Sequence, residues 1–317
     1  MAGKKMISAA RLKSLWYIYF LILPSALIIG VFAYFPAASG IYHAFFRWNG
    51  DYINEFIGLR NFVEAFQDPV LWYGFGVIAI LVAFNVVKMI PSVATAVVIN
   101  RLKTDKAAYL YKVLFVVPMI IPWMVQLLIW KFFYDPSAGL LNKFLHATGL
   151  MNVLIHIDKV FDWGVFIEGV NPVWLGDEKL VIPALILWGF PWVGIVGVLI
   201  YLAGLQSIDK SVYEAADIDG IGWFQKFFYI EFPLIMTQVR INMVMMIIGT
   251  LKTYGLMLVL FGPNGGPNGK AMVPGLYMYV NAFVHQRAGY ACAIGILLFA
   301  FILLLTEINN RFLRVEK

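Results

Sequence analysis

Charged residues are scarce in this chain of 317 residues. Asp, Glu, Lys and Arg make up 13% of it, whereas a typical soluble domain has about 25%. Hydrophobic residues make up 62%, and the mean hydropathy is +0.80. Several segments reach the roughly 20 apolar residues that are needed to cross a bilayer. The composition therefore argues against a soluble domain and predicts an all-α, polytopic membrane protein in contact with membrane lipid.

Residues that build metal and catalytic sites are also few. The single cysteine, Cys292, excludes an intrachain disulfide and a thiol-based metal site. No Gly-x-Ser-x-Gly nucleophile motif occurs. The four histidines are scattered and form no metal-ligand pair at helical spacing: His43, His146, His156 and His285. The sequence therefore predicts no catalytic residue, no metal and no cofactor.

One stretch comes close to a phosphate-binding loop, "NGGPNGKA" at 264–271. That motif needs a first glycine and a Ser or Thr hydroxyl after the lysine. Asn264 and Ala271 stand at those two positions, so we expect no nucleotide there. The net charge of +6 could suggest nucleic acid, but its distribution fits membrane topology instead, and we expect no nucleic-acid partner.

Apolar runs predict six transmembrane spans. A basic stretch, 1–14, precedes a first run that is too long for a signal peptide, so we expect it to be retained as a helix. The membrane domain is expected at 15–309, with a short tail at 310–317. The predicted spans are 15–38, 72–99, 110–133, 180–204, 232–261 and 289–309.

If the amino terminus is placed in the cytoplasm, lysine and arginine are denser in the cytoplasmic segments than in the outer ones. Because cytoplasmic loops are enriched in these residues, both termini are expected to be cytoplasmic. The outer segments then include "FIGLRNF" (56–62) and "DPSAGLLN" (135–142). The outer segment 134–179 is long for a mere connection, which favours a functional surface.

The inner loop at 205–231 is unusually polar for this chain and leads into "YEAADIDGIGWFQKFFYIEFP" (213–233). Ser211 and Glu214 have the spacing of a capping box, which predicts a helix from about Val212. Gly220 can adopt positive φ and turn the chain. A second short helix is expected through Trp223 and the phenylalanines that follow, up to the fifth span. These aromatic residues are expected to pack on neighbouring helices or lipid rather than to bind a partner.

This segment resembles the EAA loop of permease subunits of binding-protein-dependent ABC importers. The matching positions are Glu214, Ala215, Ala216, Gly220, Ile230 and Pro233, with Phe232 departing from the usual leucine. The two outer motifs, "LAGLQSIDKSVYEAADIDG" (202–220), "GGP" (265–267) and "NAF…GYACAIG" (281–295) resemble the carbohydrate-uptake, maltose-type branch. The resemblance covers nearly the whole chain and is weakest at 146–175. It implies a type I ABC importer transmembrane domain in a bacterial or archaeal plasma membrane.

The resemblance also implies partners and roles. A cytoplasmic ABC ATPase dimer would receive the loop as a coupling helix, and Glu214 would pair with a basic residue of the ATPase. Ala215 and Ala216 would allow close approach, and Gly220 would supply the bend. Asp219, Ile230 and Pro233 complete the expected coupling set. A second permease subunit, giving a heterodimer, and an extracytoplasmic solute-binding protein are implied too. Capping remains an alternative role for Glu214, and both roles are compatible.

Three basic residues fall inside predicted spans: Lys88, Arg240 and Lys252. A charge at the bilayer centre costs at least about 2.5–3.5 kcal/mol, so it normally faces protein or water. Lys88 and Lys252 are candidates for the translocation pathway, beside Tyr254, which could stack on a sugar. The alternatives are hydrogen bonds between helices, or a lysine that reaches an unwound turn near Pro91. Arg240 is nearer the cytoplasmic surface and could extend towards it.

Two other functional classes remain open alternatives. A stand-alone secondary transporter of small polar solutes often has duplicated halves and acidic residues near the bilayer centre. We find neither in the sequence, and six spans are few for that class. A membrane enzyme would need a convergent catalytic set, which the sequence does not offer. The favoured interpretation is therefore a non-catalytic carbohydrate importer subunit, whose branch handles disaccharides, oligosaccharides, polyol derivatives and glycerol phosphates.

Overall fold

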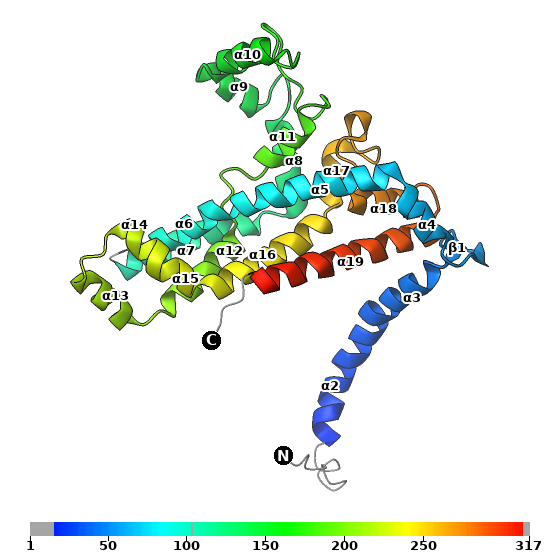
Figure 1. Ribbon diagram of the computed structural model, residues 1–317, viewed down its shortest axis with the longest axis horizontal. Helices are drawn as coiled ribbons and strands as arrows, with labels where there is room; N and C mark the ends of the chain where they lie inside the picture. The colour runs from blue at the N-terminus through cyan, green and yellow to red at the C-terminus, as the bar shows by residue number, and fades with distance from the viewer. Residues whose placement is uncertain (1–15, 103, 313–317) are drawn as a thin grey trace. The chain divides into compact units, whose positions relative to one another are not determined.

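The computed structural model describes residues 16–102 and 104–312 (Figure 1). The predicted cytoplasmic segment 1–14 and the last five residues of the predicted tail lie outside the described residues. The chain divides into two compact units. The first comprises the described part of the chain up to Phe66 together with Asn281–Ile296, and the second comprises Gln67–Val280 with the described residues from Leu297 onward.

The first unit begins with one long, curved apolar helix (Figure 1). Its parts are α2 (Trp16–Ile29), a π-helical turn (Gly30–Tyr34) and α3 (Phe35–His43). A short antiparallel hairpin follows, formed by β1 (Phe46–Trp48) and β2 (Asn54–Phe56). Helix α4 (Arg60–Gln67) then places Asn61, whose side-chain amide donates to Ala44 O at 2.8 Å and to Phe46 O at 2.9 Å. The asparagine of "FIGLRNF" therefore holds the hairpin against the end of α3.

The second unit is built around helices that run side by side. Asp68 caps α5 (Pro69–Val87), and α6 (Met89–Asn100) continues it after Lys88. Pro91 lacks an N–H and its ring crowds the carbonyl four residues earlier, which accounts for the break at this point. Helices α12 (Ile195–Gln206) and α16 (Met236–Leu251) pack along α5 and α6.

The remaining elements of the second unit have at most 12 residues each. Several are halves of segments predicted as single spans. They are α7 (Asp105–Val116), a 3-10 turn (Val117–Ile120), α8 (Trp123–Phe133), α9 (Leu140–Ala147), α10 (Leu150–Phe161), α11 (Val181–Leu187), α13 (Lys210–Ile218), α14 (Trp223–Lys226), a π-helical turn (Phe227–Glu231), α15 (Phe232–Leu234), α17 (Gly255–Phe261) and a 3-10 turn (Pro267–Gly269). Helices α18 (Pro274–Phe283) and α19 (Ala288–Phe312) complete the chain.

Among the described residues, three helices are long and apolar enough to cross a membrane alone: Tyr19–His43, Pro69–Asn100 and Ala288–Arg311. Three bent helix pairs raise the number of candidate spans to six at most. One pair is Lys106–Ile120 with Trp123–Phe133, at 88°, in the predicted third span. The predicted fourth and fifth spans are also interrupted, at 188–194 and at 252–254.

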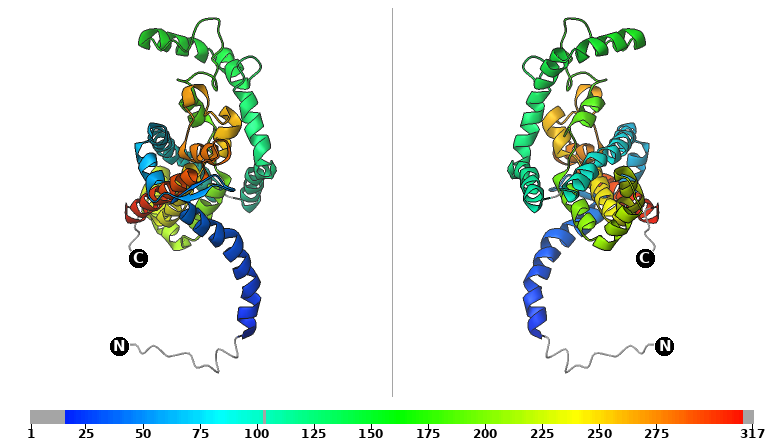
Figure 2. Two further views of the ribbon diagram at one scale, coloured as in Figure 1. Left: turned by 90° about the vertical axis from the view of Figure 1, so that its right-hand side faces the viewer. Right: turned by 90° about the vertical axis from the view of Figure 1, so that its left-hand side faces the viewer.

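The predicted outer segment 134–179 has a small core of its own. Leu141, Leu145, Met151, Phe166 and Trp174 are buried together. Asn142 links this core to its loops, because its side-chain amide donates to Pro172 O at 3.2 Å and its oxygen accepts from Trp174 Nε1 at 2.8 Å. Both figures show α9 and α10 at the far end of α8, away from α12 and α16 (Figure 2). The asparagine of "DPSAGLLN" thus helps to order a compact projection.

Candidate functional site

The polar loop at 205–231 begins with a capped helix. Asp209 caps α13 by accepting a hydrogen bond from Ser211 N at 2.8 Å. Hydrogen bonds from the Ser211 hydroxyl, and to a lesser extent from the Ser211 amide, hold the pKa of Asp209 below its usual value. The helix therefore begins at Lys210, before the predicted start near Val212, and the predicted Ser211–Glu214 capping box is wrong. Asp209 lies earlier in the chain and takes the cap position.

The residues predicted to contact an ATPase do not all lie at the surface. Glu214 and Ala215 are exposed on α13, and Asp219 is exposed at its carboxyl end. Ala216 is 3% exposed and packs within this chain, so it is not available to a partner. Of the two alanines predicted to allow close approach, only Ala215 is exposed. Gly220 has φ +68°, as its predicted role in the turn requires.

The second arm of the loop leads back to the membrane helices. Helical structure runs over Trp223–Leu234, with Ile230 half-buried and Pro233 exposed in α15. The chain then bends by 70° into α16. Phe227 and Phe232 pack on a core formed by α6, α12 and α16, as predicted for the loop's aromatic residues. Phe224 and Phe228 are exposed instead.

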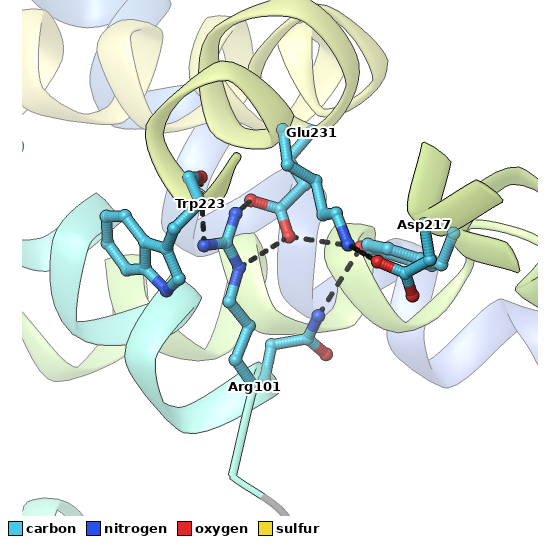
Figure 3. A network of polar contacts seen from close by, with 7 residues as sticks. Arg101, Asp217, Trp223 and Glu231 are labelled. Carbon is cyan, nitrogen blue, oxygen red and sulfur yellow. Dashed lines mark hydrogen bonds and ion pairs between the residues drawn. The ribbon is translucent and has the colours of Figure 1, made fainter. Parts of the chain in front are cut away.

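A buried ion pair fastens this arm to the end of α6 (Figure 3). Glu231 is fully buried, and Arg101 meets its carboxylate with Nη2 at 2.5 Å and Nε at 3.1 Å. The remaining Arg101 donor, Nη1, reaches Trp223 O at 3.1 Å. The guanidinium also lies over the Trp223 ring, 4.3 Å from its centre. One arginine thus holds both ends of the second arm.

The first arm joins the same cluster. The Tyr213 hydroxyl, on α13, donates to Glu231 at 3.3 Å. Burial, followed by the charge and hydrogen bond of Glu231, raises the pKa of Tyr213 to about 12, so this hydroxyl stays a donor at neutral pH. Asp217 and Lys226 link the two arms directly with an ion pair of 2.5 Å. We call Arg101, Glu231, Tyr213 and Trp223 the loop clamp.

The loop clamp was not predicted from the sequence. Arg101 ends an apolar run and is one of several inner basic residues, and Glu231 stands in an aromatic stretch. An acid beside a predicted span is a signal, because burial of a carboxylate requires a partner. The partner lies 130 residues away, and its identity follows only from the fold.

A second polar neighbourhood lies among the broken helices. A cavity of about 810 Å³ is lined by the junction of α5 and α6, by the 3-10 turn and α8, by 188–197 and by α16. Ser92 supports the irregular stretch here: its hydroxyl accepts from Gly194 N at 2.8 Å and donates to Trp192 O at 3.3 Å. Non-helical backbone in a membrane span needs such partners, or a water-filled cavity.

Of the three residues predicted for the pathway, Lys88 lines this cavity. Its ammonium donates to Leu185 O at 3.2 Å and to Trp188 O at 3.5 Å. The bond to Leu185 O in α11 is a hydrogen bond between helices, which was one of the alternatives expected for this lysine. The bond to Trp188 O reaches an unwound stretch, but this stretch is at 188–194 and not near Pro91. Lys252 and Tyr254 do not line the cavity. Lys252 is exposed at the end of α16, and Tyr254 stacks on Tyr279 with ring centres 5.4 Å apart.

Apolar helices of spanning length and broken spans around a cavity are the features of a multi-pass membrane protein. The family is then given by direct comparison. Residues 79–314 match the family described as "Binding-protein-dependent transport system inner membrane component". The chain belongs to this family.

Named relatives agree with the family match along nearly the whole chain. The diacetylchitobiose uptake system permease protein NgcF of Streptomyces coelicolor is 30% identical, over 90% of this chain and 78% of that protein. The trehalose/maltose transport system permease protein MalF of Thermococcus litoralis is 28% identical, over 91% of this chain and 90% of that protein. The fold is similar to a chain of a bacterial ABC transporter for alginate import, with a TM-score of 0.75, 21% identity and coverage of 95% and 96%.

Proposed function

We propose that this chain is a transmembrane permease subunit of an ATP-driven carbohydrate importer, and that α13 couples it to a cytoplasmic ATPase dimer. The observation that carries the proposal is the exposed Glu214 and Ala215 on α13, a helix that the loop clamp joins to the membrane helices. A helix that is exposed on one face and fastened at its base can transmit a push or pull from a soluble partner. The inner-membrane family supports this assignment.

The proposed assembly has four kinds of component. This chain would form half of the translocation pathway, and a second permease subunit would form the other half in a heterodimer. The ATPase dimer would hydrolyse ATP, so this chain would be non-catalytic. An extracytoplasmic solute-binding protein would deliver the carbohydrate. Uptake functions in the names of the relatives support the cargo class.

The proposal sets an orientation and a pathway. Loop 205–231 and both termini would face the cytoplasm, and the projection that carries α9 and α10 would face outward. The cavity beside Lys88 would belong to the pathway. Lys252 and Tyr254 remain predicted pathway residues at a separate position, where the stacked Tyr254 and Tyr279 rings would offer a flat surface to a sugar.

Reversal of one exposed charge tests the coupling role. Glu214→Lys in the assembled importer is expected to abolish carbohydrate uptake and ATPase binding, because the lysine would face a basic residue of the ATPase. Membrane insertion should be unchanged, since Glu214 is exposed and does not cap α13. The control is Asp51→Lys, the same reversal at an exposed position in the hairpin loop of the first unit.

Co-purification of the ATPase with the permease pair measures docking, and uptake of radiolabelled oligosaccharides into proteoliposomes measures transport. The Asp51→Lys importer should behave like the wild type in both assays. Uptake at the wild-type rate by the Glu214→Lys importer would show that α13 does not couple transport through this residue.

A further inference from the structure

Lys88 is a cation inside a candidate membrane span, and it has no carboxylate partner among the described residues. It follows α5, within the candidate span Pro69–Asn100, and lines the cavity described above. No aspartate or glutamate is among the residues that line this cavity, and the described part of the chain holds no ion pair to Lys88. An isolated charge in such surroundings is expensive unless an opposite charge or water meets it.

The two backbone carbonyls that bind the Lys88 ammonium do not replace an opposite charge. Leu185 O and Trp188 O accept hydrogen bonds from Nζ, and they occupy two of its three N–H donors. Carbonyl dipoles lower the energy of the cation but leave the net charge uncompensated. The third donor remains for a group in the cavity, and the carbonyls fix the position of the ammonium at its wall.

Aromatic surface lies beside the ammonium at the same cavity. Trp188 and Trp192 line the cavity, and the Lys88 ammonium lies 5.8 Å from the centre of the Trp192 ring. A ring within about 6 Å attracts a cation, but it carries no net charge and leaves the charge of Lys88 uncompensated.

Aromatic rings near the ammonium suit the remainder of a sugar. Trp188 makes edge-on contact with Trp123, with ring centres 5.5 Å apart, and lies 6.4 Å from the ring of Trp130. Trp130 also lines the cavity. Such rings offer apolar faces to the C–H side of a pyranose, while the Lys88 ammonium would bind a charged substituent.

We propose that this cavity selects an anionic carbohydrate, and that Lys88 binds its carboxylate, sulfonate or phosphate group. The inference rests on the proposed function, since it names the substrate class of the same pathway. It differs from a general pathway role, because a neutral sugar of the same size would leave the Lys88 charge uncompensated.

The test compares neutral and anionic sugars in the complete importer. Proteoliposomes that contain both permease subunits, the ATPase and the binding protein are supplied with four probes at equal concentration. These are cellobiose, cellobiouronic acid, glucose 6-phosphate and sulfoquinovose. ATP-dependent uptake is measured for the wild type, Lys88→Met and Lys88→Arg. Lys112→Met is the matched control, because Lys112 lies in Lys106–Ile120, one half of a candidate bent span, and does not line the cavity.

The wild type should transport at least one anionic probe at least tenfold faster than cellobiose. Lys88→Met should reduce that uptake by at least tenfold, the effect of losing one charge-assisted hydrogen bond, and should leave cellobiose uptake unchanged. Lys88→Arg should retain most of the activity, and Lys112→Met should match the wild type. The anionic probe that is transported identifies the charged group.

Three outcomes would overturn the inference. One is wild-type uptake of cellobiose that equals or exceeds uptake of every anionic probe, a result that does not depend on whether Lys88→Met assembles. The second is an equal fall for anionic and neutral probes in Lys88→Met, which would mean that Lys88 only pins the backbone of 185–188. The third is unchanged anionic uptake in Lys88→Met, which would mean that another group, such as one of the second permease subunit, meets the anion. Absence of ATP-dependent uptake for every probe would instead contradict the proposed function.

Discussion

Arg101 and Glu231 are 130 positions apart in the sequence and form a buried ion pair at the carboxyl end of α6. Glu231 has no exposure to solvent, while Arg101 is slightly exposed. Replacement of such a pair by apolar residues is often tolerated, whereas loss of one partner leaves an uncompensated buried charge. The arrangement is therefore most sensitive to single substitutions.

We expect Arg101→Ala to destabilise the loop clamp by about 3–5 kcal/mol, the range for breaking a buried ion pair. Trp223 O also loses its donor. The double variant Arg101→Ala/Glu231→Gln should recover part of this loss, because the buried charge is removed with its partner. Hydrogen exchange at 210–231 in the purified importer measures the effect, with faster exchange expected in Arg101→Ala than in the double variant. Equal exchange in all three proteins would rule out a clamping role.

At the residue scale the sequence predicted local features better than distant ones. The positive φ of Gly220 follows from its place after "EAADID" and is observed at +68°. The capping box at Ser211 and Glu214 was wrong, since two candidate caps lie close together and Asp209 takes the position. The Arg101–Glu231 pair could not be predicted, because each residue alone fits an ordinary inner, charged segment. The position of Lys88 at the cavity depends on how the broken helices pack against each other. A hydropathy profile contains no information about this packing.

At the scale of elements, α6 connects the two candidate sites of the second unit. Its amino end follows Lys88 at the cavity, and its carboxyl end precedes Arg101 in the loop clamp. Twelve residues at about 1.5 Å each give a length of roughly 18 Å. Ser92, one turn into the helix, holds the irregular segment at 192–194. This helix therefore offers the proposed movement of α13 a direct connection to the cavity.

The turn after α13 offers a test with a close control. Gly220 has φ +68°, where a side chain costs about 1–2 kcal/mol, while Gly222 has φ −67°, which any residue adopts. Gly220→Ala should lower uptake and the ATPase activity that transport stimulates, because the two arms of the loop would shift. Gly222→Ala should have little effect, since its added Cβ would lie 3.5 Å from the nearest atom, Gln225 Oε1. Both activities are measured in proteoliposomes; equal activity of the two variants would contradict the role of the turn.

Hydropathy predicted where the apolar segments lie, but not their interruptions. The predicted fourth span, 180–204, is divided into α11 and α12 by a stretch in which Gly189 has φ +82° and Trp192 has φ +61°. The predicted third span bends by 88° after a proline-containing 3-10 turn. The interruption of the fourth span is stabilised by Ser92 of α6, which a window over 180–204 does not contain. The turn in the third span is bonded by Gln126 of the same predicted span, whose amide donates to Pro118 O and Ile121 O.

At the scale of the whole molecule, the exposed apolar surface fits the membrane. Helices α2 and α3 form part of a candidate span, Tyr19–His43, of which none is buried within the chain. In water such a helix would be a liability, whereas in a bilayer or against another membrane subunit it is stable. The family match and the relatives of similar length place the chain in an importer.

The central claim is that ATP hydrolysis by a partner drives transport through this chain. The most direct test is carbohydrate uptake into proteoliposomes that contain the complete importer, with ATP on the side of α13, with a non-hydrolysable ATP analogue, and with ATP plus a proton and sodium ionophore pair. We predict uptake with ATP, no uptake with the analogue, and unchanged uptake when the ionophores collapse the ion gradients. Uptake that persists without ATP hydrolysis and disappears with the ionophores would contradict the account and favour a secondary transporter.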